Sequence, residues 1–79
     1  MKKARVNAPP ERDPRVDPQT GDVLITPQGL TRTVTSLELG GRVVHFITES
    51  KRAGSCHVLA WGSWCRKQRA AVLKDNLFV

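Results

Sequence analysis

Hydrophobic and polar residues alternate over the middle of the chain, a period of two that predicts β-strands. An apolar run at residues 22–26, between Thr20-Gly21 and Pro27, predicts a first strand. Residues 30–39 are rich in β-branched side chains, which suit a pleated surface and predict a second strand. After a turn at residues 51–54, residues 55–57 are expected to add another pairing strand. The middle of the chain is therefore predicted to form a small antiparallel sheet.

The adjacent glycines Gly40 and Gly41 predict a hairpin with a two-residue turn, because glycine tolerates the positive φ angles that such a turn requires. Partners symmetric about this turn are Leu37 with Val44, Thr35 with Phe46, and Arg32 with Glu49. The face expected to join the core carries Leu37, Leu39, Val44 and Phe46. The face expected to meet solvent carries Arg32, Ser36, Glu38 and His45.

Beyond His57 the hydrophobic period lengthens to about 3.6 residues, which predicts a helix from Val58 to about Leu73. Trp61 and Trp64 lie three residues apart, on adjoining faces of this helix. We expect Trp61 in the core and Trp64 at its rim. The apolar residues near the C-terminus predict that residues 75–79 add an edge strand or cover the sheet.

This order of elements predicts an α+β fold: a small, strongly bent antiparallel sheet or open β-barrel of three to four strands with one C-terminal helix. A chain of 79 residues can support one hydrophobic core. Four of the five prolines lie in the first 18 residues, where large apolar side chains are scarce. We therefore predict that residues 1–16 form a flexible, basic, proline-rich arm and that residues 17–79 form the single domain.

The composition argues against a membrane protein. No apolar stretch approaches the roughly 18 residues that cross a bilayer, and Lys2-Lys3 is not followed by the apolar segment of a signal peptide. We expect the protein in the cytoplasm of a bacterial host cell. Two cysteines are too few for the disulfide framework of a small secreted domain, so Cys56 and Cys65 are expected to be reduced.

The formal net charge is +6 at pH 7, which favours association with phosphate backbones or acidic protein surfaces. No acidic residue occurs between Glu49 and Asp75, whereas several basic residues do. We predict that they converge into one cationic surface, beside which Trp64, at the rim of the core, could stack on a base or anchor a partner. A role in the core alone for both tryptophans is the alternative. The predicted binding residues are Lys51, Arg52, Trp64, Arg66, Lys67 and Arg69. A merely solvated basic surface is the alternative.

Catalytic and metal-binding patterns are weak. The soft ligands His45, Cys56, His57 and Cys65 do not form the two closely spaced pairs typical of zinc sites. Arg66 and Lys67 could lower the pKa of the Cys65 thiol, but no base and orienting group accompany it in the sequence. No phosphate-binding glycine loop and no serine elbow occurs. We predict a noncatalytic protein without metal or cofactor.

Three stretches carry a resemblance: Asp17 to Leu24, which includes a Pro-x-x-Gly-Asp-Val opening, then Arg32-Thr33-Val34, and Cys56 to Arg66 with its Trp-x-x-Trp pair. Together they resemble small uncharacterised phage and prophage proteins, over about two-thirds of the chain. The opening is also similar to that of small barrels of the Src-homology-3, Tudor and translation-factor types. The resemblance implies a mobile-element origin and a Src-homology-3-like barrel, and it supplies no activity and no functional residue.

The first functional hypothesis is a noncatalytic protein that binds DNA or RNA through its basic face. The alternative is a protein-binding inhibitor or adaptor that docks an acidic host or phage protein. A structural role in a virion is a third hypothesis. The oligomeric state and the ordering of residues 1–16 on binding stay open.

Overall fold

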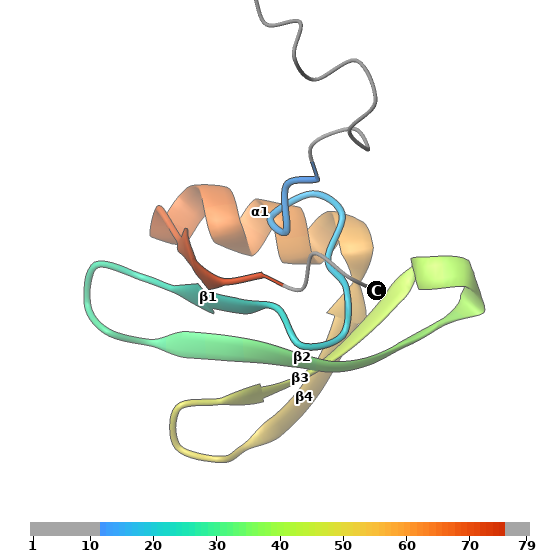
Figure 1. Ribbon diagram of the computed structural model, residues 1–79, viewed down its shortest axis with the longest axis horizontal. Helices are drawn as coiled ribbons and strands as arrows, with labels where there is room; N and C mark the ends of the chain where they lie inside the picture. The colour runs from blue at the N-terminus through green and yellow to red at the C-terminus, as the bar shows by residue number, and fades with distance from the viewer. Residues whose placement is uncertain (1–11, 76–79) are drawn as a thin grey trace, which may run out of the picture.

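The computed structural model describes residues 12–75, which form one open antiparallel sheet of five strands and one α-helix (Figure 1). The elements are β1 (Val23–Ile25), β2 (Thr31–Glu38), β3 (Val43–Thr48), β4 (Ala53–His57), α1 (Val58–Gln68) and β5 (Ala71–Lys74). The sheet order is β4-β3-β2-β1-β5. Strands β1 to β4 form a meander, and α1 then carries the chain across so that β5 pairs antiparallel with β1. The α+β class is confirmed, with β5 as a strand beyond the three to four expected.

The hairpin of β2 and β3 is confirmed, and Leu37 pairs with Val44 as predicted. Its turn is longer than two residues, because the last pair is Glu38 with Val43 and residues 39–42 form the loop. Gly40 and Gly41 adopt φ angles of 67° and 90° there. Leu39 lies in this loop and is 70% exposed, so its predicted place in the core is wrong.

A β-bulge shifts the register of this hairpin between Val34 and Ser36. Val34 pairs with Phe46 in place of Thr35, and Arg32 pairs with Thr48 in place of Glu49. Because side chains alternate with a period of two, one extra residue reverses the faces of everything beyond it. Val34 is consequently buried, and Arg32 lies on the same face as Phe46. The prediction that Arg32 faces solvent is wrong.

Helix α1 begins where predicted and ends five residues early. His57 caps its start, where the imidazole Nδ1 accepts a hydrogen bond of 3.1 Å from the Leu59 N–H. At its end Arg69 takes a left-handed conformation with φ 54°, and the Ala70 N–H donates to the Cys65 carbonyl at 2.9 Å. The chain then continues as β5, so Val72 belongs to a strand and not to the helix. Residues 76–79, most of the predicted edge strand, lie outside the described residues.

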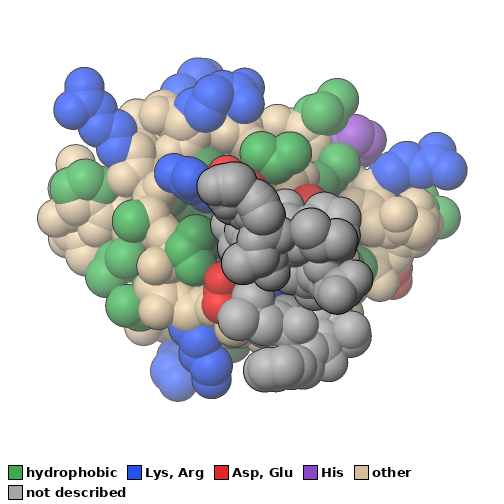
Figure 2. Space-filling model, turned by 45° about the horizontal axis from the view of Figure 1, so that its top comes forward, with side chains coloured by type: hydrophobic (Ala, Val, Ile, Leu, Met, Phe, Trp, Pro, Cys, Tyr) green, Lys and Arg blue, Asp and Glu red, His purple; other side chains and the backbone are tan. Residues whose placement is uncertain are grey.

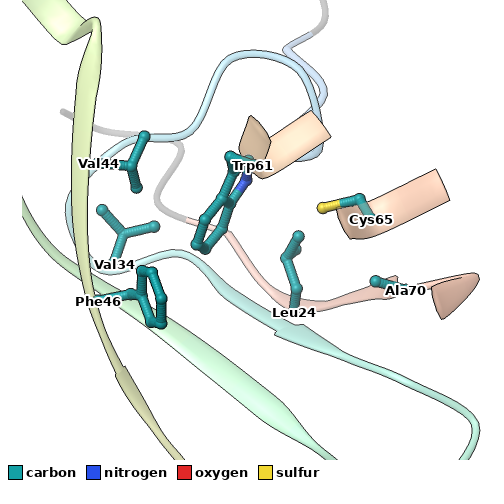
Figure 3. Packing of buried hydrophobic residues seen from close by; sticks show 7 residues of the cluster. All are labelled: Leu24, Val34, Val44, Phe46, Trp61, Cys65 and Ala70. Carbon is teal, nitrogen blue, oxygen red and sulfur yellow. The ribbon is translucent and has the colours of Figure 1, made fainter. Parts of the chain in front are cut away.

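The core lies between α1 and the bent sheet (Figure 3). Its buried apolar residues are Leu24, Val34, Val44, Phe46, Trp61, Cys65 and Ala70. Trp61 projects from α1 between the residues of β2 and β3 on one side and Leu24 and Cys65 on the other (Figure 3). It is fully buried and its ring is tilted against Phe46, with centroids 5.6 Å apart. Trp61 thus occupies the core and Trp64 its half-buried rim, as expected.

Residues 12–16 were assigned to the flexible arm, but the structure packs them onto the domain. Pro14 is buried, and its carbonyl accepts a 2.9 Å hydrogen bond from the buried indole N–H of Trp61. The Arg12 guanidinium pairs with the buried carboxylate of Asp22. Both contacts satisfy buried polar groups that would otherwise destabilise the core. The folded part therefore includes residues 12–16, and residues 1–11 lie outside the described residues.

Candidate binding pocket

An open pocket of about 490 Å³ is lined by the N-terminal segment, which we define as residues 12–16, by α1 from Gly62 onward, and by the residues that follow the helix. Three arginines from distant parts of the chain line it: Arg15, Arg66 and Arg69. Among the described residues, Asp13 is the one carboxylate in the lining, and Val16, Ala70 and Ala71 contribute to its apolar part. We call this site the arginine pocket.

The local structure explains why these arginines meet. Arg66 lies in the last turn of α1 and Arg69 is the left-handed residue that ends the helix, so the two follow each other at the helix C-terminus. Gly62 lies one turn before Arg66 and is buried against the N-terminal segment. A Cβ atom there would lie 3.4 Å from the Arg15 carbonyl oxygen, at the close end of van der Waals contact. The Arg15 backbone therefore packs closely on this turn of the helix.

The charges of the arginine pocket do not cancel. Arg15 forms a two-point ion pair with Asp13, at 2.9 Å from Nε to Oδ1 and 3.1 Å from Nη2 to Oδ2. These hydrogen bonds from Arg15 hold the pKa of the Asp13 carboxyl below its usual value, so it is ionised at neutral pH. Within residues 12–75, Arg66 and Arg69 have no ion pair. The pocket therefore keeps the charge of two guanidinium groups available to an anion.

The structure gathers only part of the predicted binding set. Arg66 and Arg69 line the pocket, whereas Lys51, Arg52 and Lys67 are exposed but do not line it. Lys51 and Arg52 lie in the turn between β3 and β4. Figure 2 shows Lys and Arg side chains in several separate places around one face of the molecule. The two predicted arginines instead meet Arg15, which the sequence analysis had placed in the arm.

Trp64 is engaged within the molecule. The guanidinium carbon of Arg32 lies 3.9 Å from the centroid of its ring, and the ring of Trp61 lies at 6.2 Å. Arg32 also packs over Phe46, at 4.2 Å. The Trp64 ring therefore has a partner on the protein itself, and Arg32 joins the site residues that sequence reasoning missed.

The cysteines do not have the properties of a nucleophile. Burial raises the pKa of the Cys65 thiol to about 11, against the opposing effect of Arg32 and Arg15. Burial also raises the pKa of Cys56. A Cys65 pKa lowered by Arg66 and Lys67, the alternative weighed from the sequence, is not found, because desolvation outweighs the lowering effect of Arg32 and Arg15. Within residues 12–75, no three His, Cys, Asp or Glu side chains are grouped to hold a metal ion.

The raised pKa of Cys65 predicts a loss of stability in alkali. In the unfolded chain a thiol titrates near pH 8.5, so between about pH 8.5 and 11 the unfolded state releases a proton that the folded state retains. The contribution of Cys65 is thus complete below pH 8.5 and decreases as the pH rises toward 11. Urea unfolding at pH 7.5 and 10.5 measures it, and Cys65→Ala should show a smaller decrease. An equal decrease in both proteins would contradict the assignment.

Comparison with known protein families, with curated proteins and with solved structures gave no match. Among the described residues, no helix has the length and apolar character needed to span a membrane.

Proposed function

We propose that this chain is a noncatalytic nucleic-acid-binding protein of phage or prophage type, acting in the bacterial cytoplasm, and that the arginine pocket is its phosphate-binding site. The observation that carries the proposal is the convergence of Arg15, Arg66 and Arg69 on one open pocket, to which the described residues contribute a single carboxylate. The phage or prophage origin is supported by the sequence resemblance.

The chemistry of the pocket suits a phosphate backbone. A guanidinium donates two parallel hydrogen bonds to phosphate oxygens, and a backbone phosphate held by Arg66 or Arg69 releases a condensed counterion. The net charge of +6 attracts a polyanion from a distance, with Lys51, Arg52 and Lys67 contributing to this field. Binding is therefore expected to be largely independent of base sequence and strongly dependent on salt.

Fluorescence anisotropy with labelled single-stranded DNA, duplex DNA and RNA, from 25 to 200 mM salt, tests the proposal. The double variant Arg66→Gln, Arg69→Gln should bind more than about tenfold more weakly in low salt, and its log–log salt slope should fall by about 2. Arg42→Gln is the control, because Arg42 is exposed and does not line the pocket. Its affinity should stay within about twofold of the wild type. Absence of binding to all three nucleic acids at 25 mM salt would refute the proposal.

The apolar part of the pocket favours one alternative, an adaptor or inhibitor that docks an acidic protein. Val16 is 68% exposed and lines the pocket beside the arginines, which suits an acidic segment with an apolar side chain. Failure of every nucleic acid to bind, together with saturable binding of an acidic peptide that the double variant abolishes, would transfer the assignment to this function.

A further inference from the structure

The guanidinium of Arg32 is held among three aromatic rings. Its central carbon lies 4.2 Å from the ring centroid of Phe46, 3.9 Å from that of Trp64 and 6.0 Å from that of Trp61. Phe46 belongs to β3 and both tryptophans belong to α1, so the rings reach Arg32 from two elements that the core holds in place. Such cation–π contacts hold the guanidinium beside the rings.

No acceptor in the described part of the protein forms a hydrogen bond with the side-chain N–H groups of Arg32. Within residues 12–75, Arg32 forms no side-chain hydrogen bond and no ion pair, although it is half-buried. Its nitrogen atoms are not among the buried atoms without partners, so they reach solvent. Desolvation lowers the pKa of Arg32, which is the direction expected of a cation with no nearby carboxylate. In contrast, the half-buried Arg12 is matched by Asp22.

We propose that Arg32 is an anion-binding residue that receives an oxyanion, the phosphate or carboxylate group of a ligand, on the edge of its guanidinium. The aromatic rings pack against the guanidinium carbon, and its N–H donors form no hydrogen bond within residues 12–75. A guanidinium with available N–H donors can make a two-point contact with a carboxylate or a phosphate. Arg32 does not line the arginine pocket, so this is a second and independent site.

Nuclear magnetic resonance of the wild-type protein tests the proposal directly. The Arg32 Nε–Hε resonance, assigned by through-bond experiments on the isotope-labelled wild-type protein, is followed during titration with sodium phosphate, sodium acetate and sodium chloride at matched ionic strength. A saturating shift is expected with phosphate, acetate or both, and none with chloride. Saturation with phosphate alone identifies a phosphorylated ligand, and saturation with acetate alone identifies a carboxylate ligand. Arg15, which already has Asp13, should shift less.

Two variants complete the test. Arg32→Lys keeps the charge but loses the planar pair of donors, so the saturating shift of the Trp64 indole N–H should require at least about tenfold more anion. Arg66→Gln should leave the Arg32 titration unchanged, which separates this site from the proposed nucleic-acid site. Shifts that are equal in all three salts, or that do not saturate, would show that Arg32 only packs on the rings and would overturn the proposal. The wild-type titration decides even if Arg32→Lys does not fold.

Discussion

Trp61→Ala is expected to leave most of the protein unfolded at 25 °C. Trp61 is fully buried at the centre of the core, its ring packs against Phe46, and its indole N–H donates to the Pro14 carbonyl. Truncation of a buried tryptophan costs about 3–5 kcal/mol, which is comparable with the whole folding free energy of so small a domain. Far-ultraviolet circular dichroism and urea unfolding measure the effect.

Two matched variants show whether the burial of Trp61 is the cause. Trp64→Ala removes a ring of the same type from the half-buried rim, so it should cost clearly less and leave a cooperative transition. Trp61→Phe keeps an aromatic ring but loses the N–H donor, which should cost about 1–3 kcal/mol through the Pro14 carbonyl left without its partner. If Trp61→Ala unfolds cooperatively at the wild-type urea midpoint, the description of the core is wrong.

Asp22→Ala is expected to cost about 3–5 kcal/mol of the free energy of unfolding. The Asp22 carboxylate is completely buried and accepts hydrogen bonds from the Arg12 guanidinium and, at 2.7 Å, from the Gln19 N–H. Its removal takes the carboxylate partner from the partly buried Arg12 guanidinium and the side-chain acceptor from the Gln19 N–H. Urea is the suitable denaturant, because guanidinium salts would screen the charges.

The control for Asp22→Ala is Asp13→Ala, which breaks the other arginine–carboxylate pair of the N-terminal segment. Asp13 and Arg15 are both about half exposed, and exposed pairs contribute about 1 kcal/mol or less. The difference between the two variants measures the effect of burial. Equal losses would show that the Arg12–Asp22 pair does not attach the N-terminal segment to the sheet.

The sequence predicted those features that a local period determines. An apolar run located β1, β-branched residues located β2, and the glycine pair located the hairpin of β2 and β3. The change to a helical period located the start of α1 and separated Trp61 from Trp64. Each of these depends on neighbours a few residues apart in the chain. Arg66 and Arg69, close together at the end of α1, both belong to the predicted binding set, and the structure places both in the lining of one pocket.

The missed features depend on contacts between distant residues. No glycine marks the bulge at Thr35, so nothing in the sequence showed that Arg32 would turn inward. A left-handed arginine, not a glycine, ends α1, and the helical spacing of Val72 continued past it. The prolines near the N-terminus suggested an arm. The contact that instead attaches this segment, the hydrogen bond from the Trp61 indole N–H to the Pro14 carbonyl, joins residues 47 positions apart, and no local pattern indicates it. That contact also brings Arg15 to the arginine pocket.

The central claim is that the arginine pocket is where a polyanion binds. Chemical-shift mapping of the isotope-labelled protein with a short single-stranded DNA at low salt tests it most directly. The account predicts that the largest perturbations fall on the Arg15, Arg66 and Arg69 side chains and on the backbone of Ala70 and Ala71. Perturbations confined to the turn of Lys51 and Arg52, or absent throughout, would contradict it.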